Sequence, residues 1–212
     1  MIRLKNFTFN SFMVNTYILW DETHECIIVD PACCNDKEKQ EMARFIRETL
    51  LKPVRNLDTH CHIDHILGNA FIAEAYGIFP EYHKASVPFL IPAREIAASF
   101  GYDLNHIPEP AKYLEENEMI RFGNSELKVL YTPGHAEGSV CFYNEKQKFV
   151  ITGDVLFRDT IGRTDLPSGD FDALMRSIKN KLFTLDDDVV VYPGHGPETT
   201  IGYEKMNNPF IR

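Results

Sequence analysis

The 212-residue sequence contains no apolar run that approaches the ~20 residues a membrane-spanning helix needs. Residues 1–20 also lack the basic head, apolar block and small-residue cleavage site of a secretion signal. We therefore expect no membrane partner and a cytoplasmic location.

Cysteine is also scarce, with five residues and no disulfide-framework or Cys-x-x-Cys spacing. This usage predicts reduced thiols, as is typical of cytoplasmic proteins. The adjacent Cys33 and Cys34 are open to two interpretations, a redox or metal pair or two small residues in a loop after Asp30-Pro31. The missing spacing favours the loop.

Positively charged residues are fewer than negatively charged ones: the chain has 22 Lys and Arg and 31 Asp and Glu, which gives a net charge of −9. Binding to nucleic acid rests largely on Lys and Arg that meet phosphates, so a nucleic-acid partner is disfavoured. We expect a small-molecule substrate instead. Nothing in the sequence indicates a particular oligomeric state.

The length suits one compact domain over residues 1–212, and short apolar runs alternate with amphipathic segments. Strands are predicted at 16–20, 26–29, 127–132, 140–143, 149–152 and 189–192. Helices are predicted at 37–51, 68–76, 87–100 and 171–183, the last one capped by Asp170. Mixed strands and helices predict an α/β sandwich with sheets inside and helices outside.

Residues 77–117 differ from the rest, because they contain five prolines and little continuous periodicity. We interpret this segment as an excursion packed beside the functional site. It is either a lid or a connector with a small apolar cluster of its own.

Four strand-like runs are each followed directly by an unusual polar cluster. These clusters are residues 58–65 after 54–57, 132–135 after 127–131, 152–154 after 149–151, and 193–196 after 189–192. Side chains offered from the ends of several strands can converge on one rim of a rigid scaffold. We therefore expect the clusters to form a single site.

The first cluster supplies three imidazoles and a carboxylate within six residues, the donors that zinc, iron and manganese accept. Two residues apart on extended backbone, His60 and His62 would point the same way, whereas Asp64 and His65 would point elsewhere. Including the later clusters, the candidate ligands are His60, His62, Asp64, His65, His135, Asp154 and His195. That is too many for one tetrahedral ion and fits two ions that share a carboxylate.

The sequence supports some histidines and carboxylates as metal ligands more strongly than others. A lone histidine is more often a surface or packing residue, so His24, His83 and His106 stay unassigned. His135 and His195 both follow Pro-Gly after a strand, and the glycine indicates a tight turn that aims the imidazole. Asp154 could instead cap a turn or a helix.

In these motifs the sequence resembles the metallo-β-lactamase superfamily, and within it the glyoxalase II-like hydrolases. The matching motifs, in order along the chain, are His60-Cys61-His62-Ile63-Asp64-His65, Thr132-Pro133-Gly134-His135, Gly153-Asp154 and Pro193-Gly194-His195. The resemblance implies a four-layer αββα sandwich. It also implies a first ion on His60, His62 and His135, a second on Asp64, His65 and His195, and a bridging Asp154.

Two further positions take their interpretation from the resemblance. Asp30 matches a family position close to the ligands, where it would orient an imidazole, although it could simply be a turn residue before Pro31. Arg163 lies where related thioesterases place a basic residue, so it would hold a substrate carboxylate or oxyanion. A structural pairing of Arg163 with Asp159 or Asp165 is the alternative.

The expected function is hydrolysis of a small thioester or ester by a metal-bound hydroxide, with two divalent ions, zinc favoured and iron or manganese as alternatives. Asp64 would orient the hydroxide. Only residues 196–212 follow His195, without the C-terminal helical domain of full glyoxalase II, so a glutathione thioester is not implied.

Three alternatives remain. The run Gly162-Arg163-Thr164-Asp165 also resembles persulfide dioxygenases, which use one iron. A β-lactamase is disfavoured by the missing secretion signal. A structural zinc module would close at four ligands, fewer than this chain offers.

Overall fold

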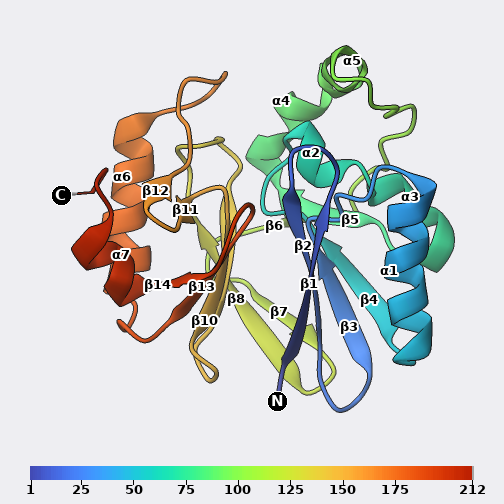
Figure 1. The fold of residues 1–212 in the computed structure, drawn as a ribbon, viewed down its shortest axis with the longest axis horizontal. Coiled ribbons are helices and arrows are strands. Elements are labelled where there is room, and N and C mark those ends of the chain that lie inside the picture. The colour runs from blue at the N-terminus through green and yellow to red at the C-terminus, as the bar shows by residue number, and fades with distance from the viewer. Residues whose placement is uncertain (212) are drawn as a thin grey trace.

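Two six-stranded sheets face each other in the centre of the molecule (Figure 1). The computed structural model describes residues 1–211. The first sheet has the order β1-β2-β3-β4-β5-β6, formed by Arg3–Phe9, Val14–Trp20, Glu25–Val29, Lys52–Leu57, Pro80–His83 and Lys112–Leu114. The second has the order β14-β13-β10-β9-β8-β7, formed by Thr199–Thr200, Val190–Pro193, Phe149–Gly153, Val140–Asn144, Ser125–Tyr131 and Met119–Phe122.

Helices cover the outer face of each sheet (Figure 1). The first sheet is covered by α1 (Asp36–Glu48) and α3 (Asn69–Tyr76), and the second by α6 (Phe171–Asn180) and α7 (Ile201–Asn207). The result is the αββα sandwich that the resemblance implied, and the predicted fold class is confirmed. None of the helices among residues 1–211 is both long and apolar enough to cross a membrane.

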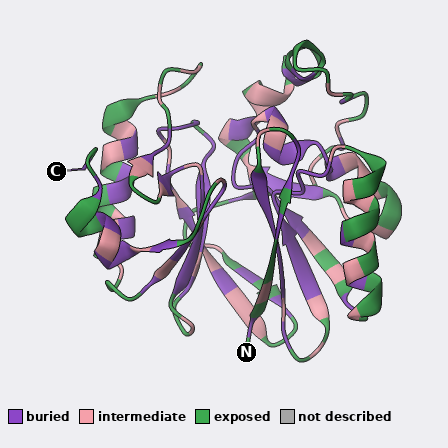
Figure 2. Cartoon of the chain, viewed as in Figure 1, coloured by how far each residue is buried: buried purple, intermediate pink, exposed green. Residues whose placement is uncertain are grey.

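The layering follows from strands that are apolar on both faces. In β2 and β3, Leu19 and Ile27 pack between the two sheets, whereas Ile18 and Ile28 pack beneath α1 and α3. Strands buried on both faces read as continuous apolar runs rather than as an alternating pattern. Figure 2 accordingly shows the central strands as mostly buried and the outward sides of the helices as exposed.

The predicted strands correspond to β2, β3, β8, β9, β10 and β13. Three of the four predicted helices are present with shifted ends. The first stops at Glu48, because Leu50 adopts a left-handed backbone with φ of 56°. The last ends at Asn180 and continues as a 3₁₀ turn at Leu182–Thr184, and Asp170 caps its start by accepting a hydrogen bond from the Ala173 N–H.

The single helix predicted at 87–100 is wrong. The structure forms two short helices, α4 (Val87–Leu90) and α5 (Ala93–Ser99), separated at Ile91-Pro92. Proline has no backbone N–H to continue the helical ladder, and its ring disturbs the preceding turn.

Both ends of the 77–117 segment belong to the first sheet as parallel strands β5 and β6. Only the residues between them, which include the 3₁₀ turn Lys84–Ser86, α4 and α5, project from the sandwich (Figure 1). They pack over α2 (Ile63–Ile66) through a small apolar cluster that includes Ile66, Tyr82 and Ala97. A role of this segment as a lid stays a prediction.

Candidate metal centre

The seven predicted donors lie together at one edge of the sandwich, where four strands end. His60 and His62 lie on the loop after β4, and Asp64 and His65 on the short helix α2 that follows it. The other three come from the ends of β8, β10 and β13, and are His135, Asp154 and His195. The convergence of strand-end clusters therefore occurs in the structure.

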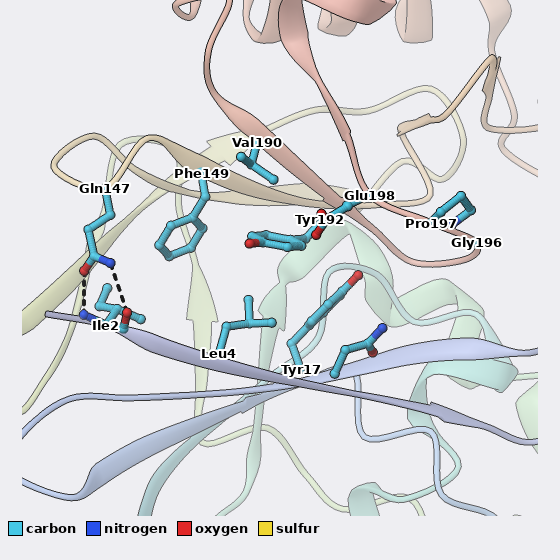
Figure 3. Close-up of a pocket in the computed structure, with 11 residues that line it drawn as sticks. Ile2, Leu4, Tyr17, Gln147, Phe149, Val190, Tyr192, Gly196, Pro197 and Glu198 are labelled. Atoms are coloured by element: carbon cyan, nitrogen blue, oxygen red, sulfur yellow. Dashed lines mark hydrogen bonds between the residues drawn. The ribbon is translucent and has the colours of Figure 1, made fainter.

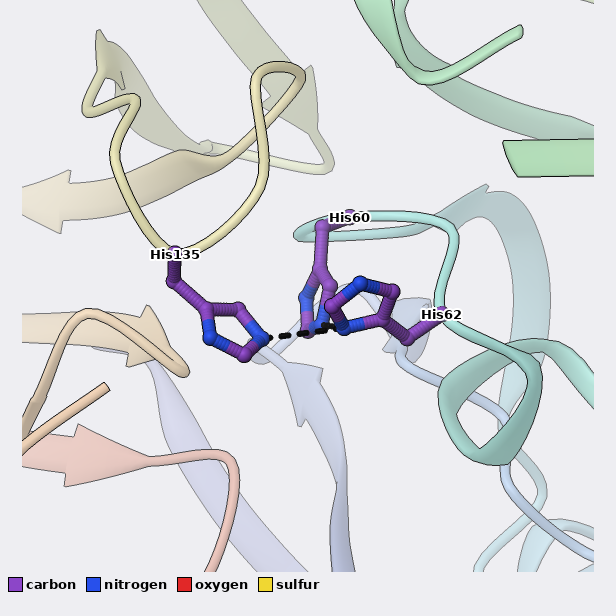
Figure 4. Close-up of side chains that lie close together, drawn as sticks. All are labelled: His60, His62 and His135. Atoms are coloured by element: carbon purple, nitrogen blue, oxygen red, sulfur yellow. Dashed lines mark hydrogen bonds between the residues drawn. The ribbon is translucent and has the colours of Figure 1, made fainter. Parts of the chain in front are cut away.

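A first set of donors consists of three imidazoles (Figure 4). The Nδ1 atom of His62 lies 3.1 Å from Nε2 of His60 and 2.9 Å from Nε2 of His135. Since the outer nitrogens of His60 and His135 have partners of their own, these three ring nitrogens present lone pairs to a common point. A cation at that point would relieve their mutual repulsion.

A second set consists of Asp64, His65 and His195. The Oδ2 atom of Asp64 lies 3.6 Å from Nε2 of His65 and 3.5 Å from Nε2 of His195. Ligands bonded to one tetrahedral zinc at 2.0–2.1 Å are about 3.3 Å apart, so this spacing suits a small divalent ion.

The Asp154 carboxylate lies between the two sets. Its Oδ2 atom is 3.6 Å from Nε2 of His135 and 3.4 Å from Nε2 of His195, and its Oδ1 atom is 3.4 Å from Nε2 of His65. Oδ1 of Asp154 and Nε2 of His65 are buried without a hydrogen-bond partner. Buried polar atoms normally have partners, so these two fit a bound cation.

The outward-facing nitrogen of most of these imidazoles is held by a neighbouring oxygen. Nδ1 of His135 donates to the Arg163 carbonyl at 2.8 Å, and Nδ1 of His195 donates to the Phe12 carbonyl at 2.9 Å. Such contacts fix the ring and leave the other nitrogen free for a metal. For both histidines, Nε2 is therefore the nitrogen that would bind a metal.

Asp30 organises two of the remaining three imidazoles. Its Oδ2 atom lies 3.0 Å from Nδ1 of His65 and accepts the Thr59 hydroxyl at 2.7 Å, and that hydroxyl lies 3.1 Å from Nδ1 of His60. Its Oδ1 atom accepts the Thr59 N–H at 2.7 Å. Asp30 thus connects one imidazole of each set, in agreement with the orienting role considered for it from the sequence.

The β1–β2 loop and the start of β2 support the second set, and the sequence analysis did not identify them. The Asn10 amide donates to the Asp64 carbonyl at 3.0 Å, and the Asn15 amide donates to the carbonyls of Pro193 and Gly196 at 3.0 and 2.8 Å. These contacts join residues more than fifty positions apart. The only local signal was the Asn-rich pattern Asn10-Ser11-Phe12-Met13-Val14-Asn15.

The local electrostatics differ between the two sets. Burial lowers the pKa of His60 well below its ordinary value and that of His62 to about 4, so both rings are neutral at pH 7. Burial also tends to lower the pKa of His195, but hydrogen bonds that its ring donates to Asp154 and Asp64 outweigh it and raise that pKa to about 9. A divalent ion at the second set would therefore replace a proton held between carboxylates.

Glycine is required before both late histidines, for different reasons. Gly134 has φ of 137°, and a Cβ there would lie 2.2 Å from the Leu174 backbone nitrogen. A Cβ on Gly194 would lie 2.2 Å from Oδ1 of Asp154. The tight turns expected from the Pro-Gly-His motifs therefore depend on close packing against α6 and the Asp154 carboxylate.

The Arg163 guanidinium forms two hydrogen bonds of 2.7 Å with Asp165, and its side chain is 61% exposed. The structural pairing considered from the sequence is therefore present, and a substrate-binding role of Arg163 stays a prediction. The two adjacent cysteines agree with the loop interpretation, since Cys33 is buried beside Gly68 and the Cys34 N–H donates to Glu38.

Two cavities lie near the loop that follows His195. One of about 310 Å³ has His195 itself in its wall. The other, of about 470 Å³, lies between the sheets and is lined by Tyr17, Phe149 and Tyr192 (Figure 3). Because none of the seven donors lines the larger cavity, the smaller one is the cavity adjoining the candidate metal centre.

Comparison with known proteins agrees with this geometry. The protein named hydroxyacylglutathione hydrolase GloC from Haemophilus influenzae is 34% identical over 203 residues, 95% of this chain and 94% of that one. The BLEG-1 B3 metallo-beta-lactamase structure has a TM-score of 0.84 at 33% identity, covering 99% of both chains. A di-iron-bound form of TTHA1623 has a TM-score of 0.87 at 34% identity, covering 97% of this chain and 99% of that one.

The family model described as the metallo-beta-lactamase superfamily matches residues 10–195, a range that includes all seven donors. Members of that superfamily are mostly metal-dependent hydrolases. Together with the αββα sandwich and the strand-end donors, this match shows that the chain belongs to the metallo-beta-lactamase superfamily.

Proposed function

We propose that this protein is a hydrolase that uses two divalent metal ions to cleave a small thioester. The observation that carries the proposal is the position of Asp154, whose Oδ2 atom lies 3.6 Å from a donor of the first set and 3.4 Å from a donor of the second. A carboxylate in that position can bridge two ions, which a site for one ion does not need.

In this proposal His60, His62 and His135 hold one ion, Asp64, His65 and His195 hold the other, and Asp154 bridges them. When bound, such a pair lowers the pKa of water toward neutrality and polarises a carbonyl oxygen. The ligand set favours zinc, and iron is the main alternative, since one similar structure is a di-iron-bound form.

Protein side chains position the reactants. The Asp64 carboxylate is 15% exposed at the cleft, so it can accept a hydrogen bond from the attacking water and orient it. The Phe89 ring lies edge-on to His62, with centroids 5.1 Å apart, and shields that side from solvent. A thiol leaving group has a pKa of about 8.5, so it departs as thiolate without a strong general acid.

The thioester assignment is supported by the relative named hydroxyacylglutathione hydrolase, which the chain covers almost completely. The five free cysteines agree with a reducing, cytoplasmic setting. We propose a small-molecule thioester as the partner, and neither nucleic acid nor a membrane.

The test combines elemental analysis with hydrolysis of a panel containing thioesters, oxygen esters and a β-lactam. Wild-type protein should contain two metal ions per chain and prefer thioesters. His62→Ala should lose metal and at least about 100-fold of the turnover, because even loss of an outer contact costs 10- to 100-fold. His24→Ala, at an exposed histidine outside the donor groups, should change neither.

Full turnover by metal-free protein would disprove the proposal. One iron per chain, with oxygen consumed on addition of glutathione persulfide, would replace it with the dioxygenase alternative. A preference for the β-lactam would instead indicate an activity like that of the BLEG-1 enzyme.

A further inference from the structure

The cavity of about 310 Å³ adjoins the candidate metal centre through one of its donors, His195, which forms part of the cavity wall. It lies between the hairpin of β11 (Leu156–Phe157) and β12 (Thr160–Ile161) and the loop after β13. The residues that line it are Phe157, Arg158, Thr160, His195, Gly196 and Pro197. A substrate that reacts at the metal donors can therefore extend past His195 into this space.

The lining combines an apolar surface with one cation. The Phe157 ring lies 6.2 Å from the His195 ring, and Pro197 adds further apolar surface. Arg158 is the only charged residue of the lining besides the histidine, and its side chain is 49% exposed. A volume near the lower limit for ligand pockets suits a short chain rather than a large group.

The Arg158 guanidinium stacks on Tyr203 and forms a long ion pair with Asp159, without a direct hydrogen bond to that carboxylate. Its central carbon lies 5.1 Å from the Tyr203 ring centroid, and its Nε atom lies 3.8 Å from Oδ2 of Asp159, beyond hydrogen-bond length. The Tyr203 hydroxyl donates to the other oxygen of Asp159 at 2.9 Å. Arg163, by contrast, donates two hydrogen bonds of 2.7 Å to the Asp165 carboxylate.

We infer that this cavity binds a short acyl chain ending in a carboxylate, with Arg158 as the partner of that carboxylate. Arginine presents a planar fork that matches a carboxylate, and Phe157 and Pro197 would cover the methylene groups. A chain with net charge −9 repels anions overall, so an anionic substrate needs a local cation. This inference rests on the proposed thioester hydrolysis.

The first test uses two thioesters of equal length, S-succinyl- and S-butanoyl-N-acetylcysteamine, with the metal-loaded protein. Wild-type protein should prefer the succinyl compound in kcat/KM. Arg158→Gln should raise KM for that compound about 10- to 100-fold, the range for a hydrogen bond to a charged group, with little change in kcat. The butanoyl compound should be unaffected, and Arg158→Lys should keep part of the preference.

Arg176→Ala is the matched control, because Arg176 is exposed on α6 and does not line the cavity. It should leave both substrates unchanged. The inference is overturned if Arg158→Gln weakens both compounds equally, which would indicate a structural role, or if it leaves the succinyl preference intact.

A binding measurement separates this inference from the proposed function. Calorimetry of the metal-loaded protein should show tighter binding of glutarate than of butyrate, and Arg158→Gln should remove the difference. If wild-type protein cleaves neither thioester but shows this Arg158-dependent difference, thioester hydrolysis fails and the cavity assignment stands. Equal binding of glutarate and butyrate by wild-type protein overturns the assignment.

Discussion

Asp30 combines an uncommon backbone conformation with a buried charge. Its φ of 49° lies in the left-handed region, and its side chain is fully enclosed. Few non-glycine residues adopt this conformation, although Asp tolerates it better than most, and such strain gathers at functional sites. Here it directs both carboxylate oxygens toward Thr59 and His65.

Asp30→Asn keeps the shape and tolerates the same backbone, but it removes the charge that fixes His65. We expect the affinity for the ion at the second set, to which His65 belongs, to fall about 10- to 100-fold, as for other outer contacts of metal ligands. Competition with a chromophoric chelator measures this change. Asp36→Asn, at an exposed position of α1, is the control, and equal affinities in both variants would contradict the role of Asp30.

Asp21 is a second buried carboxylate whose charge is stabilised, far along the sheets from the metal donors. Burial tends to raise its pKa, but hydrogen bonds from Thr23, Ser125 and Asn124 outweigh it and lower the pKa to about 2. These contacts join the β2–β3 turn to the β7–β8 turn, so Asp21 connects the two sheets.

The lowered pKa makes the contribution of Asp21 dependent on pH. Its stabilisation is fully present above the unfolded value of about 3.8 and is lost as pH falls toward 2. Asp21→Asn should therefore cost about 1–3 kcal/mol at pH 7, the range for a buried charged hydrogen-bonding group. Urea unfolding of chelator-treated protein should show this difference shrinking below pH ~4, and a constant difference would contradict the assignment.

Among the elements, α6 positions the loop that carries His135. The Asp170 N–H donates to the Gly134 carbonyl at 2.8 Å, and the Ser177 hydroxyl donates to the Pro133 carbonyl at 2.7 Å. The helix therefore starts and packs against the same turn that directs a metal donor into the centre. Its amphipathic sequence predicted the helix, but not this contact.

Gly134→Ala should disturb α6 and the centre together. The added methyl group would collide with the Leu174 backbone, and φ of 137° is unfavourable for alanine. We expect a loss of roughly 2–5 kcal/mol in unfolding free energy, from overpacking and backbone strain combined, with weaker metal binding. Gly101 also has a positive φ but has open space around it. Gly101→Ala should therefore lower the unfolding free energy less than Gly134→Ala does, and it should leave the metal affinity unchanged.

Equal effects of these two glycine variants would show that backbone strain alone matters at Gly134. The measurements are urea unfolding and metal content on the same samples. Both glycines have positive φ, but only Gly134 packs against Leu174, so a larger effect at Gly134 fits the added contact together with its less favourable φ.

For the whole molecule, the centre joins both sheets, because its donors follow strands of each. A metal that binds only the folded chain stabilises it by about 2.7 kcal/mol at a concentration of 100 times its Kd. For a chain of this size, removal of such ions should lower Tm by roughly 5–10 °C.

Calorimetric melting with and without a chelator tests this expectation. His62→Ala should show a smaller effect of the chelator, because part of the centre is already lost. An identical Tm for wild-type protein in both conditions would show that the donors do not hold a metal in the folded state.

Much of this protein follows from the sequence itself. Apolar runs such as Cys26–Val29 predict strands, because a strand buried on both faces must be apolar throughout. The run from His60 to His65 predicts a metal site, because donor side chains so close along the chain must also lie close in space. Pro92 also carries the signal that divides the predicted helix at 87–100.

The tertiary structure decided which atoms face the centre. The His195 ring is fixed by the Phe12 carbonyl 183 positions away, and Asp154 lies between the two donor sets because β10 and β13 run in parallel and end side by side. Arg158 and Arg163 look equivalent along the chain, yet only Arg158 lines the cavity beside His195. Local sequence patterns indicate which residues are candidate donors. The direction of each donor side chain is set by hydrogen-bond partners that are distant in sequence, and these partners come close to the donors only in the folded chain.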